Sequence, residues 1–226
     1  MKFDVITLFP DIINGYCTQS ITKRGIENNI IQVKTHNPRD FSKDKHKRVD
    51  DTPYGGGDGM VLACQPIFDC FENIQKENDF EFIMLTPQGE KFNQKTAVEL
   101  AKKEQIIMLC GHYEGFDERI RLGLSPREIS IGDFVLTGGE LPALILIDSI
   151  SRNLENYLGK DNCAHEDSFS SGLEGLLEYP HYTKPREYRG MLVPDVLLNG
   201  NHKEIELFRK EESIKRTKAR RPDLLK

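Results

Sequence analysis

The sequence predicts an α/β protein with a parallel sheet covered by helices, followed by a small helical C-terminal domain. Over the first 158 residues, short apolar runs alternate with longer segments of helical periodicity. Strands separated by helices pair in parallel, and the helices cover both faces of the sheet. Three of the apolar runs also end in glycine-containing segments, as expected where parallel strands lead into loops at one edge.

The expected elements of this domain follow one another along the chain. The strands are the apolar runs "FDVITLF" (3–9), "IIQVKT" (30–35), "FEFIMLT" (80–86), "IIMLC" (106–110) and "EISI" (128–131). The helices are the periodic segments 16–28, 64–77, 93–104 and 140–158. In the last of these, apolar residues at positions 144, 147, 150, 154 and 158 form one stripe.

The character of the sequence changes after the last of these helices. Residues 159–200 are rich in Gly, Ser, Pro and acidic residues and show no strong period. Residues 201–219 are periodic again, and Asn201 is a suitable N-cap for a terminal helix. We therefore expect an α/β domain over 1–158, a flexible interdomain linker over 159–178 and a small helical domain over 179–226.

Composition excludes several classes of protein. The chain is 38% hydrophobic and 30% charged, without low-complexity tracts. The apolar run before Pro10 is shorter than the core of a signal peptide, and no stretch is long and apolar enough to span a membrane. The five cysteines are scattered, without the spacing of a zinc site. These features indicate a reduced, cytoplasmic protein with no membrane partner and no recognisable metal site.

Charge is unevenly distributed along this acidic chain. The formal net charge is −5, yet residues 208–226 carry eight Lys or Arg against three acidic residues, and 39–51 is a second basic stretch. Such stretches are either a solvated helix face and a mobile loop, or two patches that hold a phosphate backbone.

The glycine-containing segments indicate one shared pocket. They are "PQG" (87–89), "GHYEG" (111–115) and "IGDFVLTGGELPA" (131–143), each after an expected strand. In open α/β sheets, ligands bind beyond the carboxyl ends of the strands. The chain lacks the GxxxxGK[ST] and GxGxxG patterns of phosphate and dinucleotide sites. The nearby Ile131, Phe134, Leu136 and Tyr113 suit a flat apolar ring, so an adenosine-like ligand is expected.

A longer set of motifs carries a family resemblance. The motifs are "YGGGDGMV" (54–61), "TPQGEKFNQ" (86–94), "GHYEGFDER" (111–119), "SIGDFVLTGGELPA" (130–143), "EDSF" (166–169), "YPHYTKP" (179–185), "VPDVLLNGNH" (193–202) and "RRPDLL" (220–225). Together they resemble the bacterial tRNA (guanine-N1)-methyltransferases of the knotted methyltransferase superfamily. The resemblance implies a C-terminal trefoil knot in the α/β domain and methyl transfer from S-adenosylmethionine to N1 of guanosine 37 in tRNA. It also implies a homodimer, with active sites at the subunit interface, and Mg²⁺ dependence with unknown ligands.

The resemblance also implies a set of donor-binding residues. These are Pro87, Gly111, Tyr113, Glu114, Gly115, Ile131, Gly132, Asp133, Phe134, Val135, Leu136, Gly138, Gly139 and Pro142. We expect the missing side chain of Gly139 to leave room where backbone meets the donor. His112 stands where many members have Arg, and Phe134 where Tyr often occurs.

The chemistry of guanine defines two catalytic roles. Guanine N1 carries a proton at neutral pH, so methylation needs a base, and a cation or donor must stabilise charge growing on O6. The resemblance implies Asp167 as the base and Arg152 as the O6 partner. The residues alone also allow an ion pair of Arg152 with Asp148 or Glu155 and a helix N-cap role for Asp167. His165 and His181 are rival bases.

Two other functions are compatible with the pattern. A nucleotide-dependent phosphotransferase would use the same fold class, although the phosphate-binding lysine motif is absent. A non-catalytic RNA-binding module would use the basic stretches without Asp167 and Arg152. For the methyltransferase, the length of segment 159–178 and the implied dimer predict that Asp167 reaches a donor site in the partner subunit.

Overall fold

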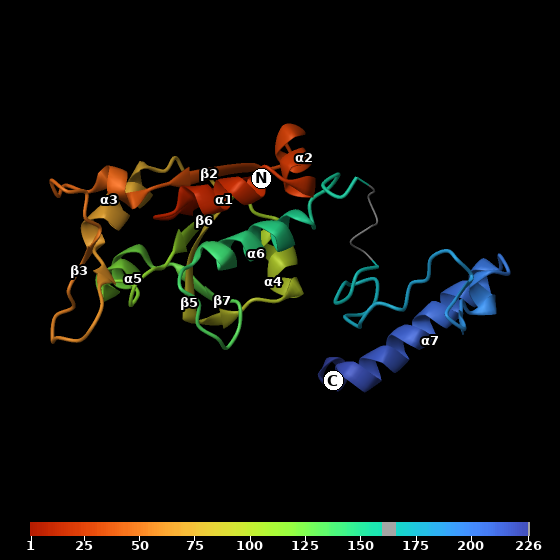
Figure 1. Cartoon of the computed structure of the whole chain (residues 1–226). Helices are drawn as coiled ribbons and strands as arrows, with labels where there is room; N and C mark the ends of the chain where they lie inside the picture. The colour runs from red at the N-terminus through yellow and green to blue at the C-terminus, as the bar shows by residue number, and fades with distance from the viewer. Residues whose placement is uncertain (160–165, 226) are drawn as a thin grey trace. The chain divides into compact units, whose positions relative to one another are not determined.

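The computed structural model describes residues 1–159 and 166–225 (Figure 1). The chain divides into two compact units, Met1–Gly159 and Lys160–Lys226. No helix in the described ranges has both the length and the apolar character needed to cross a bilayer. The limits predicted for domains and linker remain predictions, and residues 160–165 of the predicted linker lie outside the described residues.

The first unit is built on a five-stranded parallel sheet. Its strands are β1 (Lys2–Ile6), β2 (Gln32–His36), β5 (Phe80–Lys91), β6 (Gln105–Cys110) and β7 (Arg127–Ser130). They lie in the order β2-β1-β6-β5-β7, and every neighbouring pair is parallel. A separate antiparallel pair joins β3 (Asp50–Asp51) to β4 (Val61–Leu62). The predicted α/β class with a parallel sheet is therefore confirmed.

Helices cover both faces of this sheet (Figure 1). They are α1 (Pro10–Cys17), α2 (Ser20–Glu27), α3 (Cys64–Asn73), α4 (Gln94–Leu100), α5 (Glu118–Leu124) and α6 (Glu140–Ser151), with the 3-10 helix η1 (Pro38–Phe41). Because side chains alternate along a strand, Ile106 and Met108 of β6 pack into the core with α1, α4 and α6. Ile107 and Leu109 pack into a second core with α3 and α5.

The strand predictions hold, with one correction at the carboxyl end of β5. The segment "PQG" is not a loop after this strand, because β5 continues to Lys91. Its pairing with β7 shifts register between Leu85 and Glu90, so the segment is a bulge within the strand. Gly89 is required there, since a Cβ would lie 2.4 Å from the carbonyl carbon of Glu128. The bulge brings backbone to the edge where the pocket was expected.

The predicted helices exist, but their limits differ. Residues 16–28 do not form one helix: α1 ends at Cys17, and α2 begins at Ser20, whose φ of 51° is incompatible with a continuous helix. The helix predicted over 140–158 ends at Ser151, and the chain turns so that the buried Tyr157 donates its hydroxyl hydrogen to Thr22 at 3.2 Å. Helix α5 was not predicted.

The second unit contains one long helix and shorter elements. These are the hairpin β8 (Glu187–Tyr188) and β9 (Met191–Leu192), the 3-10 helices η3 (Asp195–Leu197) and η4 (Pro222–Leu225), and α7 (His202–Arg220). The terminal helix predicted over 201–219 is confirmed. Asn201 caps it as expected, because its side-chain oxygen accepts from the backbone N–H of Glu204.

Candidate functional site

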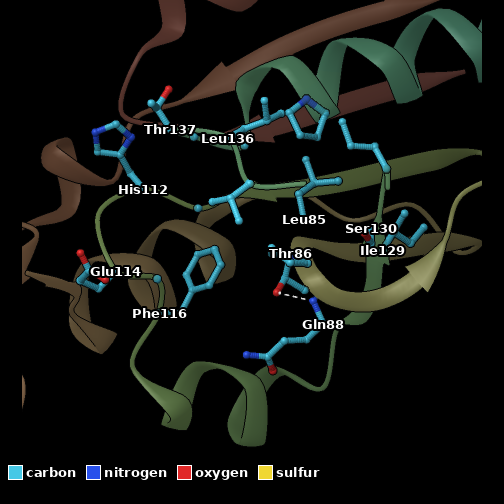
Figure 2. Close-up of a pocket in the computed structure, with 18 of the residues that line it drawn as sticks. Leu85, Thr86, Gln88, His112, Glu114, Phe116, Ile129, Ser130, Leu136 and Thr137 are labelled. Carbon is cyan, nitrogen blue, oxygen red and sulfur yellow. Dashed lines mark hydrogen bonds between the residues drawn. The ribbon is translucent and has the colours of Figure 1, made fainter. Parts of the chain in front are cut away.

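A cavity of about 420 Å³ lies at the carboxyl ends of β5, β6 and β7 (Figure 2). Its wall is formed by the β5 bulge, the segment after β6 with part of α5, and the segment from β7 into α6. The lining residues are Leu85, Thr86, Pro87, Gln88, Gly111, His112, Tyr113, Glu114, Gly115, Phe116, Glu118, Arg121, Ile129, Ser130, Ile131, Gly132, Phe134, Val135, Leu136, Thr137, Gly138, Gly139 and Pro142. The three strand ends therefore do converge on one pocket, as the sequence predicted.

Gly139 holds two of these segments together. Its backbone N–H donates to the carbonyl of Gly111 at 2.9 Å, and His112 and Gly138 form an isolated β-bridge beside it. A Cβ on Gly139 would lie 2.6 Å from Cα of Cys110. The expectation that this glycine leaves room for a ligand is therefore wrong. It leaves room for the backbone at the end of β6.

The segment after β6 is held from its other side by the short strand β4. The backbone N–H of Leu62 donates to Gly115 at 2.9 Å, and that of Glu114 donates to Met60 at 2.9 Å. Tyr113, immediately before Glu114 and Gly115, adopts a φ of 58°, in the left-handed region that non-glycine residues seldom occupy. Such local strain is concentrated at functional sites.

The cavity combines an apolar centre with polar groups at its margin (Figure 2). Its apolar lining includes Leu85, Phe116, Ile129 and Leu136, and its polar lining includes Thr86, Gln88, Glu114, Ser130 and Thr137. In the β5 bulge, the N–H of Gln88 donates to the hydroxyl of Thr86 at 3.3 Å. A lining of this kind suits a small molecule with an apolar ring and a few polar substituents.

Acidic side chains outnumber basic ones among the charged groups at the cavity. Arg121 donates to Glu128 at 2.8 Å and also pairs with Glu118. The hydrogen bond that Arg121 donates to Glu128 raises the pKa of the guanidinium, which therefore stays protonated. Two carboxylates pair with the one guanidinium, and Glu114 adds a further acidic side chain to the lining. The cavity is electrostatically suited to a ligand that carries positive charge.

Comparison with known proteins identifies the family. The sequence matches the family described as "tRNA (Guanine-1)-methyltransferase TrmD" over residues 1–226. This chain belongs to the tRNA (guanine-1)-methyltransferase family. Among its relatives, the tRNA (guanine-N(1)-)-methyltransferase of Clostridioides difficile is 54% identical over 100% of this chain and 98% of its own length. Those of Desulforamulus reducens and Anoxybacillus flavithermus are 52% and 54% identical over 100% of this chain and 89% and 91% of their lengths.

The donor-binding residues predicted from the family resemblance are gathered at the cavity. All of them line it except Asp133, whose largely exposed carboxylate pairs with Lys91 at 2.5 Å. Their role in donor binding stays a prediction. Gln88, His112 and Thr137 lie in the segments predicted to form the pocket but were not assigned to donor binding. The lining residues missed altogether are Leu85, Thr86, Phe116, Glu118, Arg121, Ile129 and Ser130. Most residues of these two groups are next to a predicted donor residue in the sequence. Arg121 lies on α5, and Asp117, which caps this helix, was the sequence feature from which the helix could have been predicted.

The predicted catalytic residues belong to different units. Arg152 is the C-cap residue of α6 in the first unit, whereas Asp167 lies in the second. Asp148, one of the alternative partners of Arg152, accepts a hydrogen bond from the hydroxyl of Tyr16 at 3.0 Å. The described backbone of 166–178 forms turns, so no helix begins at Asp167 within it.

The rival bases and the implied Mg²⁺ site complete the list of predicted site features. His181 lies 2.8 Å from a carboxylate oxygen of Glu178, and His165 is outside the described residues. In the part of the chain that the structure describes, no three His, Cys, Asp or Glu side chains are grouped to hold a metal ion. We therefore assign no residue to Mg²⁺.

Proposed function

We propose that this chain transfers a methyl group from S-adenosylmethionine to N1 of guanosine 37, beside the anticodon of tRNA. One observation carries the proposal: the donor residues implied by family resemblance, all but Asp133, line a single cavity at the carboxyl ends of three parallel strands. Membership of the tRNA (guanine-1)-methyltransferase family over the whole chain supports the reaction class. A tRNA substrate also implies a cytoplasmic location.

The cavity suits S-adenosylmethionine in shape and charge. When bound, this donor supplies an electrophilic methyl group on a positively charged sulfonium. Leu85, Ile129 and Leu136 offer apolar surface to its adenine ring. The carboxylate of Glu114 provides negative charge that favours the sulfonium. The short β-bridge between His112 and Gly138 fixes the spacing of two walls of the site.

Asp167 and Arg152 complete the proposed reaction. The carboxylate of Asp167 takes the proton from guanine N1, which leaves the N1 electron pair free to form the new bond to carbon. The guanidinium of Arg152 stabilises the negative charge that develops on O6. Methylation at N1 then breaks the carbon–sulfur bond, and its electrons remain on the sulfur of the departing product.

The second unit is the proposed tRNA-binding part. Its helix α7 carries basic residues along most of its length, including Lys210, Lys215 and Lys218, with exposed side chains. In the adjoining hairpin, Tyr188 is exposed, and the guanidinium of Arg189 lies 5.2 Å from its ring. Cations and exposed aromatic rings bind phosphates and bases of RNA. We assign 179–226 to tRNA binding.

The apolar surface of the first unit supports the homodimer. Ile12 of α1 and Leu141 and Ile145 of α6 are all exposed, although apolar side chains of this size are usually buried. A second copy that covers this surface would lie next to the donor cavity, because Pro142 of the same helix lines it. We infer that the active sites lie at this interface.

We also propose that the first unit contains the family's trefoil knot. The hydrogen bond between the backbone N–H of Gly139 and the carbonyl of Gly111, which joins two loops, is consistent with it.

The proposed function is tested by whether methyl transfer depends on the base at position 37 of the tRNA. Unmodified tRNA with guanosine 37 should accept label from methyl-labelled donor, whereas the same tRNA with adenosine 37 should not. Adenine lacks both the N1 proton and the O6 atom on which Asp167 and Arg152 act. Equal labelling of the two tRNAs would refute guanosine 37 as the target. Binding of the guanosine tRNA without labelling would instead support a non-catalytic RNA-binding module.

A further inference from the structure

One stripe of α7 faces the chain segment 166–179 of the same unit. Its members stand four residues apart and therefore lie on one side of the helix: Arg209, Ser213, Thr217 and Arg221, the last just beyond its end. Ser213 and Thr217 are the two buried side chains of this described helix. Helices normally bury apolar side chains, so two buried hydroxyls indicate a specific polar contact.

These two hydroxyls bind both backbone groups of one residue. The N–H of Leu177 donates to Oγ1 of Thr217 at 3.0 Å, and Oγ of Ser213 donates to the carbonyl of Leu177 at 2.6 Å. The Thr217 hydroxyl in turn donates to the backbone carbonyl of Ser213 at 2.8 Å. Losing either hydroxyl would leave a polar group of Leu177 without this partner in a shielded place. We call this arrangement the Leu177 clamp.

The two residues after the clamp hold the neighbours of Asp167. The N–H of Glu178 donates to Oγ of Ser168 at 2.9 Å, and the phenol of Tyr179 donates to Oε2 of Glu166 at 2.8 Å. The residues immediately before and after Asp167 are therefore both held by hydrogen bonds. Burial and the hydrogen bond to Glu166 raise the pKa of Tyr179 to about 12, so the phenol keeps its proton at neutral pH.

The two ends of the stripe contact the same segment through aromatic rings. The guanidinium of Arg209 lies 4.7 Å from the ring centre of Tyr179, and that of Arg221 lies 5.8 Å from that of Phe169. Cations at such distances are attracted to the face of an aromatic ring. All four members of the stripe thus act on the short piece of chain that carries Asp167.

We propose that Ser213 and Thr217 are positioning residues, which hold the carboxylate of Asp167 in the place where it takes the guanine proton. The inference rests on the proposed role of Asp167 as base. A general base works only within hydrogen-bond reach of its proton, and a displacement of about 1 Å can cost about a hundredfold in rate. Leu177, Ser213 and Thr217 do not line the donor cavity, so we expect donor binding to be unchanged when the clamp is lost.

A matched pair of substitutions at Thr217 tests the clamp in the full-length protein. Thr217→Val keeps the shape of the side chain but removes the hydroxyl, whereas Thr217→Ser keeps the hydroxyl. At saturating donor and tRNA, the single-turnover rate of methyl transfer should fall about tenfold for Thr217→Val and stay within about twofold for Thr217→Ser. The Kd values for donor and tRNA should change less than about twofold for both. Equal rates for the two variants would overturn the proposal.

A double-mutant cycle shows whether Thr217 acts through Asp167. In the Asp167→Asn background, Thr217→Val should slow transfer no further, because the positioned carboxylate is already gone. A full additional loss in that background would overturn the positioning role. If Asp167→Asn alone left the rate unchanged, the proposed base would be wrong, which is a separate failure. If circular dichroism shows that Thr217→Val is unfolded, Ser213→Ala takes its place in the same cycle with the same expected results.

Discussion

The backbone N–H of Gly139 donates a hydrogen bond to the carbonyl of Gly111 at 2.9 Å, which ties the loop after β7 to the loop after β6. A Cβ on Gly139 would lie 2.6 Å from Cα of Cys110, a distance that backbone can relieve only by moving. The integrity of the donor cavity therefore depends on a contact within the protein rather than on space left for the ligand.

Gly139→Ala should consequently weaken both the fold and donor binding. We expect a loss of about 1–3 kcal/mol in the free energy of unfolding, the usual cost of overpacking, together with weaker binding of S-adenosylmethionine. Chemical denaturation and calorimetric titration measure the two effects. Gly15→Ala in α1 is the control, because a Cβ there meets no atom within 4 Å. Unchanged stability of Gly139→Ala would show that the two loops separate readily.

Leu136→Trp should block the donor while the fold survives. Leu136 lines the cavity and is partly exposed, so a larger ring has open space to enter and fills the site. We expect the Kd for S-adenosylmethionine to rise at least about tenfold, which corresponds to about 1.4 kcal/mol. Leu122→Trp on α5 makes the same change at a more exposed position that does not line the cavity, and its Kd should match the wild type. If the wild type, Leu136→Trp and Leu122→Trp all had the same Kd, the donor would bind outside this cavity.

Asp167→Asn should abolish most of the chemistry but leave donor binding intact. The amide keeps the size of the side chain but has little affinity for a proton, so single-turnover rates should fall by about 10²–10⁴. His181→Gln tests the rival base and should change the rate less than about twofold, since removal of a spectator leaves the proton-transfer step intact. A fall of less than about fivefold for Asp167→Asn would assign proton removal to another group.

The fold class and the converging strand ends were predictable because they follow from the pattern of apolar residues. Alternating apolar runs gave all five strands of the sheet, and Asn201 marked the start of α7 correctly. The break at Ser20 was not predictable, since the apolar periodicity continues across it. The end of α6 depends on Tyr157 packing against a distant helix, and no local pattern encodes that contact.

The site could be predicted only in part, because it also depends on contacts between residues that are distant in sequence. The glycine pair 138–139 correctly indicated a close backbone approach, but its partner, Cys110, is distant in sequence. Arg121 was not predicted because its helix α5 was not predicted, and only the fold brings this side chain to the cavity. The donor and the catalytic roles came from family resemblance, since spacing alone does not distinguish one adenosine-like ligand from another.

Mixing two impaired variants at limiting donor tests whether each active site is shared by two subunits. At a donor concentration well below its raised Kd, Leu136→Trp should bind little donor but keep its base, whereas Asp167→Asn should bind donor but lack the base. If Asp167 acts in the partner's site, each mixed dimer has one complete site. Random exchange makes about half of the dimers mixed, so activity should return to about a quarter of wild type. No recovery in mixtures with proven subunit exchange would show that the base acts within its own chain.

The central claim is methyl transfer to N1 of guanosine 37 by the cavity and Asp167 together. Its most direct test is to incubate the full-length protein with S-adenosylmethionine and unmodified tRNA, digest the product and locate the modified nucleoside by mass spectrometry. The account predicts N1-methylguanosine at position 37 and no other new methylated nucleoside. It also predicts that the product nearly disappears with Leu136→Trp at limiting donor and with Asp167→Asn at saturating donor. Methylation at another base or another atom of guanine, or full product formation by Asp167→Asn, would contradict it.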